Sequence, residues 1–334
     1  MQENKLHQNP LRMICMDSIQ AVPVTWLWYP YIPYGKITII QGDPGEGKTT
    51  LVLHLAAALT QGRCPGSEEV CEPVTVIYQT AEDGMADTIK PRLLSAGADC
   101  TRVLFIDESR KCISMTDDRL EEAIRQTDAR LVILDPIQAY LGADVDMHRA
   151  NEIRPIMSHL GGLAEQYGCA IVLIGHMNKA VGVKASYRGL GSIDFAASAR
   201  SVLIVARDRE NPQIRVVIHA KSSLAPEGKP IAFRLDPDNG FRFLGTYDAD
   251  PEELLAGTGG RKKAKLAEDL LLSALSQEAV SQQRILERAR DLGISKRTLD
   301  QVKKDLGVQS QKRQDGWYWY LPEHPEPRLQ DCNN

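Results

Sequence analysis

The sequence is poor in aromatic residues and lacks a long apolar run. Only 6% of its 334 residues are aromatic, and no stretch approaches the roughly 18 apolar residues of a membrane-spanning helix. The opening residues, MQENKLHQNP, also lack the apolar run of a secretory signal. We therefore expect a cytoplasmic protein that has no membrane partner.

Cysteines are few and never spaced as C-x-x-C. The seven cysteines are odd in number and scattered, which argues against the disulfide framework of a small secreted domain. Cys64 and Cys71 flank one loop and could form a ligand pair, but no second pair accompanies them. We expect reduced thiols and no zinc site.

Positive charge is under-represented in most of the chain. Residues 1–260 carry 26 basic and 33 acidic residues, whereas 261–322 carry 13 basic and 8 acidic residues, a net charge of +5. This segregation suggests that the C-terminal part meets an anionic partner, although a solvated basic face is the alternative. The length of the chain suggests two or more domains.

Short β-branched runs alternate with helical stretches from Lys36 to about Phe243, which predicts an α/β domain with a mostly parallel sheet. The turn-like sequence RDRENPQ between the last two runs predicts an antiparallel hairpin. The expected strands are 36–41, 74–80, 102–107, 130–135, 170–175, 201–206 and 214–220, and the expected helices are 49–60, 86–96, 116–127 and 152–167.

Five parts of the chain follow from composition. They are an N-terminal segment (1–34), an α/β core (35–247), a linker (248–264), a small helical domain (265–322) and a disordered tail (323–334). The apolar stretch from Trp26 to Pro30 precedes the first core strand. We expect it to pack on its own core, with a neighbouring subunit as the alternative.

A glycine-rich loop lies between a predicted strand and a predicted helix. Its sequence, GDPGEGKT, fits the phosphate-loop pattern G-x-x-x-x-G-K-[ST] in full. Glycines let the backbone wrap phosphates closely, and the helix N-terminus supplies positive potential. We expect Lys48 to bridge the β and γ phosphates of ATP and Thr49 to ligate Mg²⁺. The expected nucleotide-binding residues are Gly42, Asp43, Pro44, Gly45, Glu46, Gly47, Lys48, Thr49 and Thr50.

Two acidic positions complete the predicted hydrolytic site. Asp135 ends the apolar run LVILD, which is the form of a magnesium-linked acid at the end of a strand. Glu82 follows the strand VTVIYQT and is the expected general base for the attacking water. Asp83 is the alternative base, and Glu82 could instead be a helix-starting acid.

Six motifs, GDPGEGKTT, TAEDG, LVILDP, GHMNK, YRGLGSIDFAASARSV and HAKSS, occur in this order over about residues 15–245. They resemble the RecA-fold ATPases of the RepA type, hexameric helicases encoded on plasmids and phages, together with related AAA-labelled ATPases. The resemblance implies a RecA-type fold, a homohexamer, ATP with Mg²⁺, and a DNA helicase or translocase in the replication of a mobile element.

The resemblance also assigns roles to single residues. His176 would sense the γ phosphate, with a plain polar strand end as the alternative. Because the active site of such ATPases lies between subunits, Arg200 and Lys221 would act on the neighbour's nucleotide. The segment 177–192 would face a central pore and touch single-stranded DNA through Lys179, Lys184 and Arg188, although such loops are also simply solvated. Its only aromatic residue is Tyr187, so the segment offers little aromatic surface on which bases of single-stranded DNA could stack.

The basic C-terminal part resembles a winged helix-turn-helix, with helices expected at 265–277, 281–292 and 295–306 and a strand at 317–321. Ser295 would cap the recognition helix, and 312–320 would form the wing. A protein-docking role is the alternative to duplex DNA binding. The expected DNA-contacting residues are Ser295, Lys296, Arg297, Thr298, Gln301, Lys304, Lys312 and Arg313.

The leading interpretation is therefore an ATP-driven, ring-forming DNA motor. The alternative is an ATP-dependent DNA-binding regulator or recombination mediator that separates no strands. A phosphotransferase is disfavoured, because no lid-like acceptor domain accompanies the core.

Overall fold

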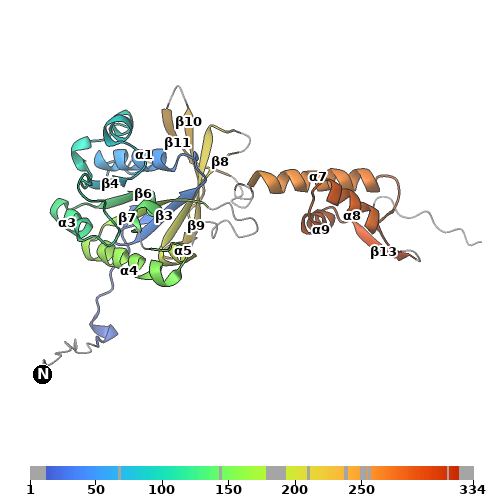
Figure 1. Ribbon diagram of the computed structural model, residues 1–334, viewed down its shortest axis with the longest axis horizontal. Coiled ribbons are helices and arrows are strands. Elements are labelled where there is room, and N and C mark those ends of the chain that lie inside the picture. The colour runs from blue at the N-terminus through green and yellow to red at the C-terminus, as the bar shows by residue number, and fades with distance from the viewer. Residues whose placement is uncertain are drawn as a thin grey trace, which may run out of the picture. The chain divides into compact units, whose positions relative to one another are not determined.

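The chain consists of two compact units, Met1–Tyr247 and Asp248–Asn334 (Figure 1). The computed structural model describes residues 13–66, 69–142, 145–177, 193–208, 211–236, 240–248, 254, 257–313 and 316–322.

A nine-stranded sheet forms the centre of the first unit, in the order β11-β10-β9-β8-β3-β7-β6-β4-β5. The six strands from β8 to β5 in this order are parallel, and the remaining three continue antiparallel. This arrangement confirms the predicted α/β fold with a mostly parallel sheet. The strands are β3 (Ile37–Gly42), β4 (Val76–Thr80), β5 (Val103–Leu104), β6 (Leu131–Asp135), β7 (Ala170–His176), β8 (Ser201–Arg207), β9 (Ile214–Ser222), β10 (Ile231–Asp236) and β11 (Gly240–Thr246).

The hairpin β10–β11 extends the sheet where no strand was predicted. Every second residue of β11 is half-buried, which places Phe241 and Phe243 on the inner side. This alternation in the sequence could have indicated a strand. The half-exposed strand lacks, however, the continuous run of β-branched apolar residues that marks the central strands. Pairing with β10 supplies the stabilisation that local propensity lacks.

Helices cover both faces of the sheet. Helices α1 (Lys48–Thr60) and α2 (Lys90–Ser95) pack against one face, whereas α3 (Asp118–Thr127) and α4 (Ala150–Tyr167) pack against the other. Successive strand residues serve opposite faces, so Ile39 and Ile40 belong to different core clusters. The short helix α5 (Ile193–Ser198) precedes β8.

The helix expected at 86–96 is divided in two. A π-helical turn, Met85–Ile89, precedes α2, and Pro91 lies in the first turn of α2. Proline lacks an N–H group and is tolerated at a helix start rather than inside a helix, so the α-helix begins only at Lys90.

The N-terminal aromatic segment packs on its own domain, as predicted. It forms a small antiparallel pair of β1 (Trp26–Trp28) and β2 (Ile32–Pro33). Leu27 and Trp28 are buried, and the Trp28 ring contacts Tyr31 and Phe243. The burial of these large side chains joins the segment to the core cluster that also contains α1.

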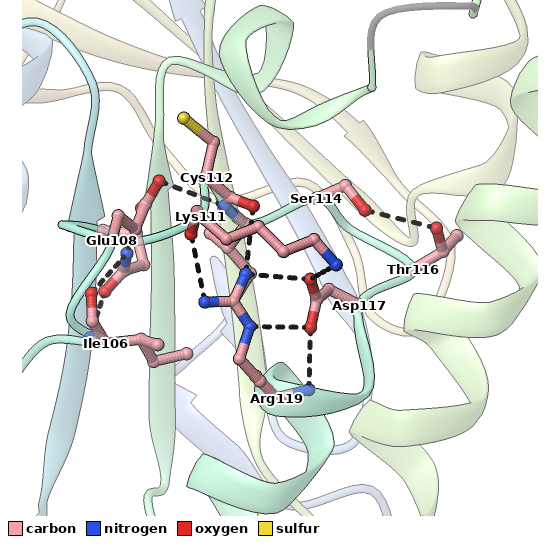
Figure 2. A network of polar contacts seen from close by, with 10 residues as sticks. Ile106, Glu108, Lys111, Cys112, Ser114, Thr116, Asp117 and Arg119 are labelled. Atoms are coloured by element: carbon pink, nitrogen blue, oxygen red, sulfur yellow. Dashed lines mark hydrogen bonds and ion pairs between the residues drawn. The ribbon is translucent and has the colours of Figure 1, made fainter.

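The loop between β5 and α3 is irregular but fixed by a polar network (Figure 2). Arg119 donates hydrogen bonds to the carbonyl oxygens of Lys111 and Cys112 and to the carboxylate of Asp117. The hydrogen bonds from Arg119 to the Asp117 carboxylate hold the pKa of that carboxyl group far below its usual range. Glu108 accepts a hydrogen bond of 2.5 Å from Gln79 of β4, which ties the loop to the strand that leads to Glu82.

The second unit is a small domain with its own core around Trp319, which is 1% exposed. Helix α7 starts at Gly257, inside the segment predicted as a linker. The strong helix formers of RKKAKLAEDLL explain why the helix includes residues 261–264. The winged helix-turn-helix assignment stays a prediction. The elements are α7 (Gly257–Leu275), β12 (Val280–Ser281), α8 (Gln282–Asp291), α9 (Lys296–Asp305), β13 (Gln309–Arg313) and β14 (Gly316–Tyr320), with a sheet order β12-β14-β13.

Candidate active site

The phosphate loop joins β3 to α1, and its glycines are required by close backbone approach. A Cβ atom on Gly42 would lie 2.4 Å from the carbonyl oxygen of Val205, and one on Gly47 would lie 2.6 Å from the Leu235 side chain. Gly45 and Gly47 also have positive φ angles of 78° and 86°. Only glycine adopts these conformations without strain. The loop is therefore a tight cradle at the N-terminus of α1.

The cradle is positively charged and pre-formed. The Lys48 ammonium donates hydrogen bonds of 2.9 Å to the carbonyl oxygens of both Gly42 and Asp43. Burial lowers the pKa of Lys48, and the carboxylate of Asp135 partly opposes this effect. Among the described residues, no side chain caps the first turn of α1, so its N–H groups face the cradle together with the ammonium group. These features fit the phosphates of a nucleotide.

A carboxylate and a hydroxyl meet beside this cradle. The Thr49 hydroxyl donates a 2.7 Å hydrogen bond to Oδ2 of Asp135, and the Tyr78 hydroxyl donates one of 3.0 Å to the same oxygen. Burial raises the pKa of Asp135, while these two donors act in the opposite direction. A hydroxyl and a carboxylate are oxygen ligands of the type that Mg²⁺ prefers, so the pair fits this ion.

The turn after β4 separates the two candidate bases. The Thr80 hydroxyl lies 3.4 and 3.3 Å from the N–H groups of Glu82 and Asp83 and fixes the turn. Asp83 is held by Arg92 of α2 at 3.0 Å. Glu82 instead directs its carboxylate to within 3.7 Å of His176 Nε2. Of the two acids, Glu82 is the one that faces the phosphate loop.

His176 connects the loop to this turn. It ends β7, in register with Gly42 of β3, so its ring lies beside the cradle. Its Nδ1 is 3.4 Å from Nζ of Lys48, and its Nε2 faces Glu82. One imidazole therefore contacts both the phosphate-binding lysine and the acid predicted to activate water.

Comparison with known proteins agrees with this arrangement. A family described as AAA domain matches residues 3–182, which is more than half of the chain. The chain belongs to the AAA domain family. With its phosphate loop, lysine and acidic residues assembled in one place, this AAA domain is an ATPase.

Curated relatives match a shorter part of the AAA domain protein. The DNA repair protein RadA of Bacillus subtilis is 28% identical over 148 residues, which cover 43% of this chain and 28% of RadA. RadA of Pseudomonas aeruginosa is 27% identical over 151 residues, with the same two shares. The chain thus spans less than a third of the length of these relatives. A solved structure described as an ATPase domain is 18% identical, with a TM-score of 0.49, and the match covers 64% of this chain and 85% of that one.

The two residues expected to act in trans lie away from the phosphate loop of the AAA domain. Arg200 immediately precedes β8, and Lys221 pairs with Val202 near the start of that strand. Strand β8 runs parallel to β3, and the phosphate loop follows the C-terminal end of β3. Both residues therefore lie at the other end of the strands, near the start of β8. Neither residue can reach the phosphate loop of its own chain. The side chain of Arg200 is exposed there.

Lys221 is bound within its own chain. Its ammonium donates hydrogen bonds of 2.8, 2.9 and 2.8 Å to the carbonyl oxygens of Ala196, Ala197 and Ala199 at the end of α5. A lysine that caps the C-terminus of a helix is already satisfied, since all three of its donors are used. The sequence did not reveal this role, because the partners are 22 or more positions apart in the chain.

The predicted DNA-contacting residues fall in two groups. Lys179, Lys184 and Arg188 lie outside the described residues. In the second unit, the Ser295 hydroxyl accepts a 3.2 Å hydrogen bond from the N–H of Thr298 and caps α9, as predicted. The buried side of α9 holds Leu299 and Val302. The exposed predicted residues are Ser295, Lys296, Gln301, Lys304 and Lys312; Thr298 and Arg313 are half-buried, and the side chain of Arg297 is outside the described part.

Two contacts of the site were not anticipated. Tyr78 lies in a buried strand, where a lone phenol needs a hydrogen-bond partner, and this requirement was the available signal. Glu46 of the phosphate loop lies 3.5 Å from Arg207 and 3.7 Å from Arg215. The pairing of β8 and β9 beside the loop brings these arginines to Glu46, and no local sequence pattern predicts this contact.

Proposed function

We propose that this ATPase is a RecA-type motor, a ring-forming DNA helicase or translocase that serves the replication of a plasmid or phage. The observation that carries the proposal is the position of His176 between Lys48 and Glu82. The next residues along the chain begin the segment that resembles a DNA-contacting pore loop. A change at the nucleotide therefore has a short covalent path to that segment.

ATP with Mg²⁺ would be held by the phosphate loop from Gly42 to Thr50, with Thr49 and Asp135 as the metal ligands. Mg²⁺ supplies charge neutralisation at the phosphate oxygens. Lys48 would hold the β and γ phosphates with the ammonium group that the structure places at the carbonyl oxygens of Gly42 and Asp43. Glu82 accepts the proton of the attacking water, and His176 follows the change in charge through its contacts with Lys48 and Glu82.

The proposed assembly is a homohexamer in which Arg200 of one subunit completes the site of the next. Arg200 is exposed and far from its own phosphate loop, as a trans-acting cation must be. Lys221 is the second candidate for this role, but its three hydrogen bonds to α5 would have to break first. We therefore assign the trans role to Arg200 and give Lys221 the task of holding α5 behind it.

The proposed substrate is DNA. Single-stranded DNA would pass the core segment with Lys179, Lys184 and Arg188, and duplex DNA would meet α9 and the β13–β14 hairpin of the second unit. The net charge of +5 over 261–322 and the exposed lysines of α9 support the second part.

The second candidate is an ATP-dependent regulator or recombination mediator without unwinding activity. The similarity to proteins named DNA repair protein RadA favours it. Electron microscopy and mass measurement with ATP and single-stranded DNA separate the two. A closed six-membered ring that unwinds a forked duplex supports the motor, whereas a filament or dimer without unwinding supports the regulator.

A further inference from the structure

A hollow of about 540 Å³ opens next to the phosphate loop on the side of α1. Its walls come from three places: the first turns of α1, the end of α2, and the facing ends of β10 and β11. In Figure 1, the hairpin β10–β11 lies beside α1. This volume falls within the range of small-ligand sites.

The hollow begins where the phosphate cradle ends. Thr50, the last residue of the expected nucleotide-binding set, lines it directly. Leu235 lines it as well and also packs against the cradle, because a Cβ on Gly47 would lie 2.6 Å from its side chain. The cradle and the hollow are therefore continuous through the residues after Lys48. The sugar and base of a nucleotide whose phosphates lie in the cradle would extend in this direction.

His54 and Phe241 line the hollow and belong to an aromatic stack that continues to the buried Phe233. The ring of Phe241 lies 4.0 Å from that of His54 and 5.1 Å from that of Phe233, with interplanar angles of 12° and 28°. Burial lowers the pKa of His54 to about 4, so its ring is neutral at physiological pH. Stacked, uncharged rings are suited to the face of a heterocyclic base.

Another part of the lining is polar and is connected to the turn that carries Glu82. Arg92 and Ser95 of α2 line the hollow. Arg92 also holds Asp83, the neighbour of Glu82, at 3.0 Å. A ligand in the hollow would thus contact Arg92, which holds the turn that carries Glu82, the proposed general base.

We propose that this hollow binds the nucleoside half of the nucleotide, with the base against the ring stack that ends at His54. The inference rests on the proposed ATP site and adds the residues that recognise the part of ATP beyond the phosphates. It predicts that the base and sugar contribute to affinity, and that Arg92 links their binding to the position of the Glu82 turn.

A second hollow provides a matched control. It has a volume of about 400 Å³, shares His54 and Phe241 with the first, and is lined on its other side by Arg63, Cys64 and Ala96. Ser95 lines only the hollow next to Thr50, whereas Ala96 lines only the second one. Tryptophan at each of these adjacent positions fills one hollow or the other while making a similar change to the chain.

The test is calorimetric binding of ATP and of inorganic tripolyphosphate to the full-length chain. The unmodified protein should bind ATP about tenfold or more tightly than tripolyphosphate, because stacking of a base contributes substantially. Ser95→Trp should weaken ATP binding about fivefold or more and leave tripolyphosphate binding unchanged. Ala96→Trp should change neither.

Equal affinity of the unmodified protein for the two ligands would overturn the inference, whatever the variants do. It would also be overturned by a Ser95→Trp protein that binds ATP normally, or by a loss of ATP binding confined to Ala96→Trp. Tripolyphosphate binding without an advantage for ATP would leave the phosphate site standing and remove only the nucleoside site. Binding of neither ligand would reject the nucleotide site and this inference together.

Discussion

His176 Nε2 lies 3.7 Å from Oε1 of Glu82, while Asp83, the next residue, is held 3.0 Å from Arg92. Two adjacent acids of the same turn are thereby given different surroundings. The sequence predicts Glu82 as the general base with Asp83 as the alternative, and the geometry favours Glu82, because its carboxylate contacts the histidine that lies beside Lys48.

The first prediction compares the two acids. Glu82→Gln keeps size and hydrogen bonding but removes the proton acceptor, so hydrolysis should fall about 100-fold or more while nucleotide binding persists. Asp83→Asn should have a much smaller effect, since it only weakens the contact with Arg92. Steady-state ATPase rates and equilibrium binding of ATP measure both effects. A larger loss of turnover in Asp83→Asn would assign the base to Asp83.

The second prediction concerns Lys48. Its ammonium is held at the loop by the carbonyl oxygens of Gly42 and Asp43, and it is 4% exposed. Lys48→Ala should abolish detectable ATP turnover, because no other cation of the described loop occupies this position. Circular dichroism should report an unchanged fold. Normal turnover by a folded Lys48→Ala protein would contradict the assignment of the site.

The central strands and the phosphate loop could be predicted from sequence for a physical reason. Strands such as β3 and β6 are buried on both faces, so their apolar runs are continuous, and the loop pattern is dictated by backbone approach to phosphates. The half-exposed hairpin β10–β11 has no such run. The partners of Lys221 and Asp83 were hidden as well, because these contacts depend on which elements the completed sheet brings together.

The third prediction tests the proposed trans action of Arg200. Arg200→Ala and Lys48→Ala proteins should each be nearly inactive, but mixing them should partly restore ATPase activity. A mixed interface joins an intact phosphate loop from one subunit to an intact arginine from the other. Co-assembly is verified by pull-down of one tagged variant. Mixtures that co-assemble yet show only the summed activity of their parts would reject a shared site.

The fourth prediction concerns pH and His54. Burial lowers the pKa of His54 from 6.5 to about 4 in the folded state, so the unfolded chain takes up a proton first as the pH falls. This group therefore destabilises the fold progressively from about pH 6.5 down to about pH 4. His54→Phe keeps a ring against Phe241 and should lose less stability than the unmodified chain over this window. Urea unfolding at about pH 7 and about pH 5 measures the difference.

An exposed histidine provides the control for this effect. His159 lies on the solvent side of α4, and His159→Gln should leave the loss of stability over the same pH interval unchanged. The same loss in His54→Phe as in the unmodified chain would show that His54 is not the group responsible.

The last prediction concerns the second unit, whose own core around Trp319 should allow it to fold alone. Because α7 begins at Gly257, the fragment should comprise residues 257–322. It should bind duplex DNA with an affinity that falls steeply as salt rises, since each neutralised phosphate releases counterions. If Lys296 and Lys304 of α9 each contact a phosphate, Lys296→Glu with Lys304→Glu should weaken binding strongly. The negative slope of log affinity against log salt concentration should then become less steep by about 1.8, because two phosphate contacts are lost.

The matched variant is Lys265→Glu on α7, where the lysine is exposed and paired with Glu268 at 3.2 Å. It reverses one lysine where the α9 variant reverses two, so it should lower the logarithm of the affinity by much less than half as much as the α9 variant does. Fluorescence anisotropy with a labelled duplex over a salt series measures all three fragments. A folded fragment without salt-sensitive DNA binding would instead identify the second unit as a protein-docking domain, because its positive charge would then be only a solvated face.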